Sequence, residues 1–269
     1  MTVILKIVIV YFLFLVLLLF IQNRLIFHPT KEYCAVPRDL GLKGEDVSFT
    51  TSDGMKLHGW FFHVDRDAPV MLFCHGNAGN ISDRLENVKL LLEIPVNVFI
   101  FDYRGYGKSP GKPSEEGVYR DAEAAWQYIR KQRGTPAERI VFFGRSLGGA
   151  IALDVAIRHP VRAIILESTF VSLRSLVKKM FPYLLFYPFI PSKFANDRKI
   201  EKIHIPILII HGSDDHTVPW RQGKMLYELA NQPKEFWLVK GAQHTDSYEV
   251  SPLEYKRKLG NFMKNVGLF

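Results

Sequence analysis

The chain has 269 residues, of which 48% are hydrophobic and 23% charged, values that suit a folded protein with a full hydrophobic core in one or two domains. Together with only two cysteines, they exclude a disordered, collagenous or disulfide-stapled small protein. The formal net charge of +8 is a moderate basic excess, which by itself indicates little more than a charged surface.

The N-terminal segment is strongly apolar. From Val3 to Ile21 only Lys6 is not apolar, and about 20 apolar residues in a helix cross the hydrocarbon core of a bilayer. No small-residue cleavage site follows, so an uncleaved anchor is favoured over a signal peptide. We therefore predict a single-pass membrane anchor over residues 1–24 and a folded domain over residues 25–269. Positive charges on both flanks leave the side of the membrane open, although their count leans towards a cytoplasmic domain.

From Asp46 onward, short apolar runs alternate with amphipathic stretches. An antiparallel pair of strands is predicted over Val47–Thr51 and Lys56–Val64, joined by a Ser-Asp-Gly turn. Six more strands, short and rich in β-branched or aromatic residues, are predicted over Val70–Cys74, Val96–Phe101, Ile140–Phe143, Ala163–Leu166, Ile207–Ile210 and Phe236–Val239. Helices are predicted over Glu115–Lys131, Ala150–Ile157, Gln222–Ala230 and Leu253–Met263. The alternation predicts an α/β fold with a mostly parallel eight-stranded sheet covered by helices on both faces.

One segment interrupts this alternation, between the predicted strands that end at Leu166 and begin at Ile207. It contains twelve uncharged residues, Met180–Pro191, with three prolines that disfavour a regular helix. An insertion of about 40 residues in a compact domain is typical of a lid or binding element, so we predict a short cap insertion over residues 168–204. Its aromatic side chains are candidates for substrate binding: Phe181, Tyr183, Phe186 and Tyr187.

A serine flanked by glycines lies between a predicted strand and an Ala-rich helix. The segment Gly144–Gly149 reads Gly-Arg-Ser-Leu-Gly-Gly. A nucleophile elbow has this order of strand, sharp turn and helix, with small residues that let the serine backbone take a strained conformation. The pattern alone is common, but its position after a strand favours Ser146 as a nucleophile over a surface serine in a glycine-rich turn.

A serine nucleophile needs a histidine base that is oriented by a carboxylate. In an elbow of this kind the acid and the histidine follow the serine in chain order, each after a strand. His244 follows the last predicted strand, which makes it the candidate base. Asp214 and Asp215 both follow the preceding strand, and Glu167 ends the strand before the cap. The residues alone therefore leave the acid open.

A glycine-rich loop, His75–Asn80, follows the predicted strand Val70–Cys74 and reads His-Gly-Asn-Ala-Gly-Asn. Acyl transfer develops negative charge on an oxygen atom, which two backbone N–H groups can stabilise. One such group comes from a loop of this kind and the other from the residue after the nucleophile. We therefore predict an oxyanion hole made by the backbones of Asn77 and Leu147, with an ordinary turn into a helix as the alternative.

These segments resemble the α/β-hydrolase superfamily and, more narrowly, the membrane-anchored serine hydrolases of its serine-aminopeptidase-like branch. Besides the elbow and the glycine-rich loop, the resemblance rests on Leu25–Pro29, Asp53-Gly54, Asp102–Ser109 and Gly212-x-x-Asp215-x-x-Val218-Pro219. It implies an α/β-hydrolase fold and an acid three residues after Gly212, which selects Asp215. It also implies a structural role for Asp102–Ser109. The serine at the elbow argues against the dehalogenases and epoxide hydrolases of the superfamily, which use an aspartate there.

The motifs and the resemblance together predict a serine hydrolase that cleaves carboxylic esters or thioesters through an acyl-enzyme intermediate. Ser146 would attack the acyl carbonyl, His244 would accept its proton and Asp215 would orient the histidine. No metal or organic cofactor is implied. A peptidase and a non-catalytic membrane-anchored scaffold are the alternatives, whereas no motif supports nucleic-acid binding.

The composition of the predicted cap suggests a substrate class. Residues 168–204 hold seven Lys or Arg and two acidic residues beside the aromatic run. Such a surface can lie against an anionic bilayer, which would present lipid-like acyl substrates such as monoacylglycerols, lysophospholipids or thioester-linked lipids. The alternative interpretation is that these residues form the apolar ceiling of an acyl pocket.

Overall fold

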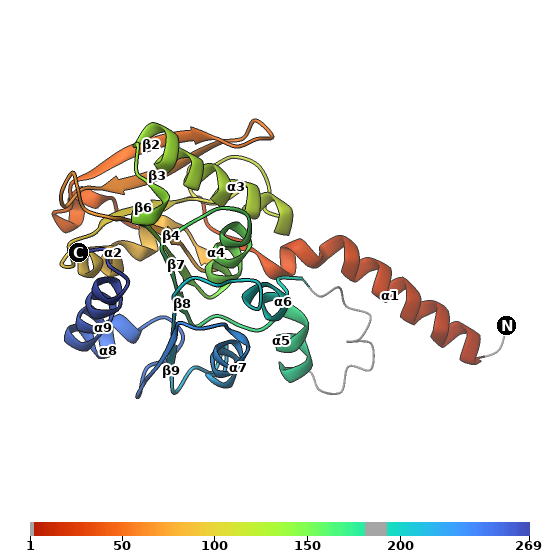
Figure 1. The fold of residues 1–269 in the computed structure, drawn as a ribbon. Helices are drawn as coiled ribbons and strands as arrows, with labels where there is room; N and C mark the ends of the chain where they lie inside the picture. Colours follow the sequence, from red (N-terminus) through yellow and green to blue (C-terminus); the bar gives the residue numbers. More distant parts are fainter. Residues whose placement is uncertain (1–2, 181–192) are drawn as a thin grey trace.

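An eight-stranded sheet forms the centre of the computed structural model, which describes residues 3–180 and 193–269 (Figure 1). Its strand order is β10-β9-β8-β7-β4-β6-β3-β2. Strand β3 is antiparallel to both of its neighbours, and all the other pairs are parallel. The strands are β2 (Gly44–Thr50), β3 (Lys56–Phe62), β4 (Val70–Cys74), β6 (Asn97–Phe101), β7 (Ile140–Arg145), β8 (Ala163–Glu167), β9 (Ile207–Gly212) and β10 (Lys234–Val239). The predicted mostly parallel, eight-stranded sheet is confirmed.

Helices cover both faces of the sheet, so the central strands bury both of their faces. Successive residues of a strand point to opposite faces. Accordingly, Leu72 and Phe142 belong to one hydrophobic core and their neighbours Phe73 and Phe143 to the other. The first core is completed by helices α3 (Glu115–Gln127), α4 (Leu147–Arg158), α6 (Asn196–Ile200) and α7 (Arg221–Leu229). The second is completed by α2 (Leu85–Leu91) and α9 (Pro252–Asn265). This double burial explains the nearly continuous apolar runs in the sequence.

Several elements differ from their predicted bounds. Strands β7 and β9 run two residues further than predicted, because pairing continues to Arg145↔Glu167 and to Val239↔Gly212. The α-helical part of α3 ends at Gln127 and is followed by a π-helical turn, Tyr128–Gln132. Elements that the sequence pattern did not predict are α2, α5 (Leu173–Met180), α6, α8 (Ser247–Val250), the 3-10 turns Pro37–Leu40, Ile81–Arg84 and Ala137–Arg139, and a two-stranded parallel sheet of β1 (His28–Pro29) and β5 (Ala78–Gly79).

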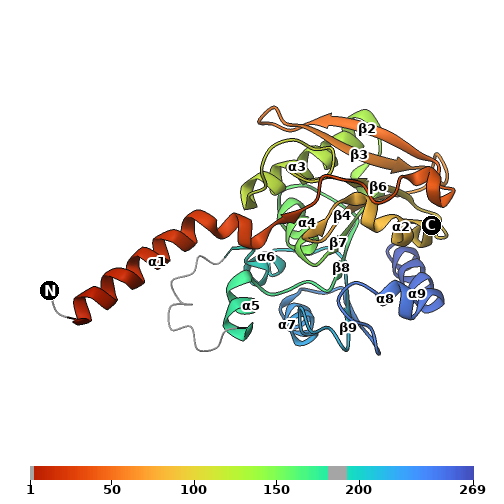
Figure 2. The same cartoon turned by 180° about the vertical axis from the view of Figure 1, so that it is seen from behind.

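The N-terminal apolar segment forms one helix, α1 (Val3–Ile26), which projects from the rest of the structure (Figures 1 and 2). Within residues 3–180 and 193–269, no helix qualifies by length and apolar character as a membrane span. The transmembrane anchor predicted for residues 1–24 is therefore not supported.

The described parts of the predicted cap lie beside the C-terminal end of α1. They include α5 (Leu173–Met180) and α6 on either side of residues 181–192, and both views place them near that end of the helix (Figures 1 and 2). The Lys193 Nζ donates a hydrogen bond to Asn23 Oδ1 at 3.3 Å. The base of the cap thus contacts the last turn of α1.

The buried residue Arg104 joins the loop after β6, in which it lies, to helix α3 and to the β2–β3 turn. The Arg104 backbone N–H and Nε donate to Asp121 of α3 at 2.8 and 2.9 Å. Its Nη1 and Nη2 donate to Asp53, in the β2–β3 turn, at 2.8 and 3.0 Å. The Asp121 side chain has no exposed surface and that of Arg104 is 7% exposed. The Arg104 guanidinium therefore compensates the cost of removing the Asp121 carboxylate from water.

We expect the substitution Arg104→Met to lower the free energy of unfolding by about 3–5 kcal/mol, because it leaves the buried Asp121 charge without a partner. Arg120→Met is the matched control, since Arg120 also pairs with Asp53, at 3.4 Å, but is 46% exposed; it should cost less than about 1 kcal/mol. Urea denaturation of both variants measures the difference. Equal losses would contradict the assigned role of Arg104.

Candidate active site

Ser146 lies at a sharp turn between β7 and α4, and its backbone is strained. Its φ of 53° and ψ of −116° are values that a non-glycine residue rarely adopts. The turn depends on close backbone approach: a Cβ at Gly148 would lie 1.8 Å from the Cys74 carbonyl oxygen, and one at Gly144 would lie 2.5 Å from the Cα of Gly149. Glycine is therefore required at both positions. The Ser146 N–H donates to the carbonyl of Glu167 on β8 at 2.8 Å, which fixes the turn to the sheet.

Three of the predicted residues are joined by hydrogen bonds. The Ser146 Oγ lies 3.0 Å from Nε2 of His244, and Nδ1 of His244 lies 2.8 Å from Oδ2 of Asp215. The loops after β9 and β10 supply the acid and the histidine. The three side chains therefore meet at the carboxyl ends of the parallel strands. The Asp215 side chain is buried, whereas that of His244 is 20% exposed.

The surroundings of Asp215 keep its carboxyl group ionised. Burial raises the pKa of this group, but hydrogen bonds from His211 and His244 outweigh burial and hold the pKa well below its usual range. Its Oδ1 also accepts the N–H groups of Val218 at 2.7 Å and Thr217 at 2.9 Å. A carboxylate fixed in this way can orient a neighbouring imidazole and stabilise its cation.

The alternative acids do not contact His244 in the same way. Asp214 is exposed and accepts a hydrogen bond from the Ser213 hydroxyl at 2.7 Å. Glu167 is buried, and its Oε2 accepts Arg145 Nη2 at 3.1 Å and the Tyr255 hydroxyl at 2.7 Å. The geometry therefore favours Asp215, which is the residue that the family resemblance selects.

Buried polar residues around the elbow were not identified from the sequence. Arg145, next to the serine, is fully buried and also donates to Asn87 Oδ1 of α2 at 2.8 Å. His211 is buried behind Asp215, with its Nε2 2.7 Å from the Val218 carbonyl oxygen and 3.3 Å from Asp215 Oδ2. In the sequence, Arg145 could have been noticed as a charged residue inside the elbow, and His211 as a polar residue at the end of an apolar strand.

The glycine-rich loop lies against the elbow. A Cβ at Gly76 would lie 3.7 Å from Cβ of Ser146. The His75 ring nitrogen Nδ1 lies 2.7 Å from the carbonyl oxygen of Gly76. Burial lowers the pKa of His75 to about 4, so the neutral ring donates this hydrogen bond at neutral pH. Because C=O and N–H point in opposite directions in a trans peptide, the bond orients the N–H of Asn77.

Leu147, the second predicted donor, is the first residue of α4, and the N–H groups of a first helical turn have no acceptor within the helix. Leu147 thus follows the serine directly, and Gly76, the neighbour of Asn77, lies against it. Their role as an oxyanion hole stays a prediction.

The predicted substrate-binding residues Phe181, Tyr183, Phe186 and Tyr187 lie outside the described residues. Within the described ranges, no group of three or more His, Cys, Asp or Glu side chains is arranged to hold a metal ion.

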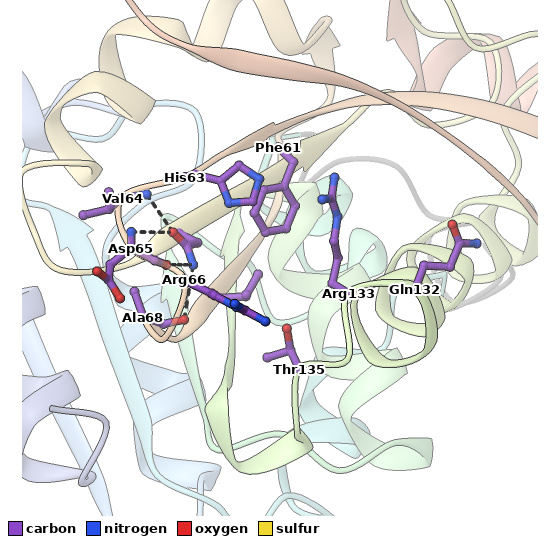
Figure 3. A pocket seen from close by; sticks show the side chains of 11 residues that line it. Phe61, His63, Val64, Asp65, Arg66, Ala68, Gln132, Arg133 and Thr135 are labelled. Carbon is purple, nitrogen blue, oxygen red and sulfur yellow. Dashed lines mark hydrogen bonds between the residues drawn. The ribbon is translucent and has the colours of Figure 1, made fainter.

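A cavity of about 570 Å³ lies at the amino ends of strands β4 and β6, opposite the strand ends that carry Ser146 (Figure 3). Its lining includes Val70 and Asn97, the first residues of β4 and β6, whereas Ser146 follows the end of β7. Two basic side chains of the lining already pair with Glu45: Arg133 at 2.6 Å and His63 at 3.3 Å. This cavity is separate from the cluster around Ser146.

Comparison with known proteins gives one family. Residues 69–198 match the model of the alpha/beta hydrolase fold. The uncharacterized protein YfhR of Escherichia coli K12 is 39% identical over 216 residues, which cover 76% of this chain and 74% of YfhR. The alpha/beta hydrolase domain-containing protein WAV2 of Arabidopsis thaliana is 35% identical over 237 residues, covering 80% of this chain and 77% of WAV2.

Solved structures share the fold of this chain. The esterase Pf2001 of Pyrococcus furiosus superimposes with a TM-score of 0.73 at 25% sequence identity, covering 89% of this chain and 98% of the esterase. The esterase domain of a Rhodothermus marinus protein, at 21% identity and a TM-score of 0.64, shares the fold.

The strain at Ser146 leads to a stability prediction. Ser146→Gly and Ser146→Ala both remove the hydroxyl, but only glycine tolerates the positive φ without cost. We expect the free energy of unfolding of Ser146→Gly to be about 1 kcal/mol higher than that of Ser146→Ala, as measured by urea denaturation. A glycine variant that is no more stable than the alanine variant would argue against strain at this turn.

Proposed function

Since the chain belongs to the α/β-hydrolase family, we propose that it is a serine hydrolase that cleaves carboxylic esters or thioesters through an acyl-enzyme intermediate. The observation that carries the proposal is the continuous hydrogen-bonded series Ser146–His244–Asp215, with distances of 3.0 and 2.8 Å. The esterases among the structural neighbours support an ester as the substrate.

In the proposed acylation step, the Ser146 Oγ attacks the acyl carbonyl carbon while Nε2 of His244 accepts its proton. Asp215 holds the Nδ1–H tautomer and stabilises the imidazolium that forms. The backbone N–H groups of Asn77 and Leu147 stabilise the negative charge on the carbonyl oxygen. The tetrahedral intermediate then expels the leaving group, which takes the proton from His244.

In the proposed deacylation step, His244 accepts a proton from water as the water oxygen attacks the acyl carbon. The second tetrahedral intermediate collapses with cleavage of the bond between the acyl carbon and the Ser146 oxygen. The serine recovers its proton from His244, and a carboxylic acid leaves. Every group that this cycle needs belongs to the chain, the substrate or water.

A peptidase is less well supported. An aminopeptidase needs a carboxylate to hold the amino terminus of its substrate, and the candidate in this chain is Glu167, which ends the strand before the cap. Its side chain has no exposed surface and its Oε2 accepts hydrogen bonds from Arg145 and Tyr255, so it is not free to hold a substrate amino terminus. A scaffold without catalysis would not require the strained backbone of Ser146, which costs folding free energy and is typical of a functional site.

Asp215→Asn should lower kcat for p-nitrophenyl butyrate by about 10³–10⁴-fold, because an amide neither holds the productive tautomer nor stabilises the imidazolium. Asp214→Asn is the matched control: the neighbouring carboxylate is exposed and does not contact His244, so its kcat should stay within about 2-fold of wild type. Labelling with a fluorophosphonate probe should be lost in Ser146→Ala. A wild type that is folded but neither labels nor hydrolyses esters would overturn the proposed function.

We propose further that the substrates are lipid-like esters met at a lipid surface. Exposed apolar side chains gather on α1, where Val10, Phe12 and Leu13 are each at least 60% exposed. Lys178 on α5 and Lys202 after α6 are exposed basic residues of the cap, which lies beside the end of α1. An apolar helix next to basic residues binds anionic lipid surfaces by combined burial and charge attraction.

We expect the full-length chain to bind vesicles of phosphatidylcholine and phosphatidylglycerol, and Phe12→Asp to weaken that binding by about 10-fold or more, because a charge replaces buried apolar area. Leu253→Asp is the control, since Leu253 is 76% exposed but lies on α9. Cosedimentation with vesicles measures both. Absence of wild-type binding, or equal loss in the two variants, would contradict a lipid-binding role for α1.

A further inference from the structure

The chain that leaves α1 runs directly onto the glycine-rich loop. We use the name N-terminal strap for residues Phe27–Thr30, which connect α1 to the body of the domain. Within the strap, β1 pairs in parallel with β5 in the register His28↔Ala78 and Pro29↔Gly79. The Thr30 N–H donates to the Gly79 carbonyl at 3.2 Å. The segment that follows α1 is thus an extra strand against the proposed oxyanion loop.

The strap also contacts the residue proposed to supply an oxyanion donor. The His28 N–H donates to Oδ1 of Asn77 at 3.3 Å, and the Tyr106 hydroxyl donates to the Asn77 carbonyl at 2.7 Å. Further along the loop, Asn80 Nδ2 donates to Oγ1 of Thr30 at 3.0 Å. His75 fixes the loop before Asn77, and the strap fixes it at and after Asn77.

A buried aromatic side chain holds the strap in place. Phe27 is 3% exposed, and its ring packs edge-on against Phe194 with 6.2 Å between centroids. Phe194 in turn packs against Tyr119 of α3 and against Phe170. The Phe27 N–H still donates to the Asn23 carbonyl at 2.9 Å, so Phe27 joins the last turn of α1 to the domain.

We propose that the N-terminal strap is a positioning element for the oxyanion hole, with Phe27 as its key positioning residue. The inference rests on the proposed function and adds to it a role for residues that touch neither the nucleophile nor its base. A donor in an oxyanion hole interacts with the transition state rather than with the bound ester. Loss of its alignment by about 1 Å is enough to reduce a rate strongly. The strap should therefore affect kcat and leave KM nearly unchanged.

The test is a comparison of full-length Phe27→Ala with Phe262→Ala. Phe262 is also 3% exposed but lies on α9, in the other hydrophobic core, so both variants lose a buried ring. At a temperature where both are folded, we expect Phe27→Ala to lower kcat for p-nitrophenyl butyrate by about 10–100-fold with KM within about 3-fold. We expect Phe262→Ala to keep both constants. Affinity for a boronic acid transition-state analogue should fall in parallel with kcat.

A second variant guards against unfolding of Phe27→Ala. Phe27→Leu keeps an apolar side chain in the site, so it should fold and show a smaller fall in kcat in the same direction. In addition, hydrogen exchange of the amides of residues 76–80 should be faster than in wild type for Phe27→Leu and unchanged for Phe262→Ala.

Two results would overturn the inference. The first is a kcat of the Phe27 variants no lower than that of Phe262→Ala, with unchanged exchange in the loop. The second is a rise in KM at constant kcat, which would assign the strap to substrate binding. If the wild type itself neither hydrolyses esters nor reacts with the fluorophosphonate probe, the proposed function fails together with the inference, and this outcome is distinct from the other two.

Discussion

The start of helix α4 packs so closely on the ends of β4 and β7 that no side chain fits between them. The glycines at 144, 148 and 149 meet backbone or Thr169 atoms at distances that a Cβ could not tolerate. With the helix held there, the chain has one residue in which to turn from strand to helix, and Ser146 makes this turn at a φ of 53°. The strain is maintained by the surrounding packing, and it presents the serine hydroxyl at the strand ends.

Everything else in the site is arranged around this turn. The backbone N–H of Ser146 donates a hydrogen bond to β8. The buried Arg145 side chain donates to Glu167 and Asn87. The loop that begins at His75 packs against Ser146. The buried charges are paired: Arg145 with Glu167, and Asp215 with the two histidines that lower its pKa. In a low-dielectric interior, such pairs are costly to break, so the elbow is held rigidly.

The parts of the structure that could be predicted from sequence are those encoded by local patterns. The central strands are apolar on both faces and stand out as short continuous runs, and the elbow, His244 and the Asp214-Asp215 pair each follow such a run. The choice between Asp214 and Asp215 needed the family resemblance, because adjacent carboxylates at a loop differ only in direction. The geometry then agrees with it, since Asp215 is buried against His244 while Asp214 is exposed.

Long-range partners of single side chains could not be predicted. The bond between Tyr255 and Glu167 joins residues 88 positions apart, and the strands β1 and β5 have two residues each, too few for any alternation. The apolar N-terminal segment has a clear helical signal and forms α1. The transmembrane assignment is not supported, because no helix among the described residues meets the length and apolar criteria of a membrane span.

The wide spacing of the site residues along the chain has a consequence for folding. Ser146 and His244 are 98 positions apart, and His244 is carried by the loop after β10, the strand at one edge of the sheet. Contacts between distant segments form late, because closing a long loop costs entropy before the contact is gained. The complete Ser146–His244–Asp215 series therefore exists only once the edge strand has docked. Reactivity at Ser146 would then report the fully native protein, and a partly folded intermediate with the other strands in place would be silent.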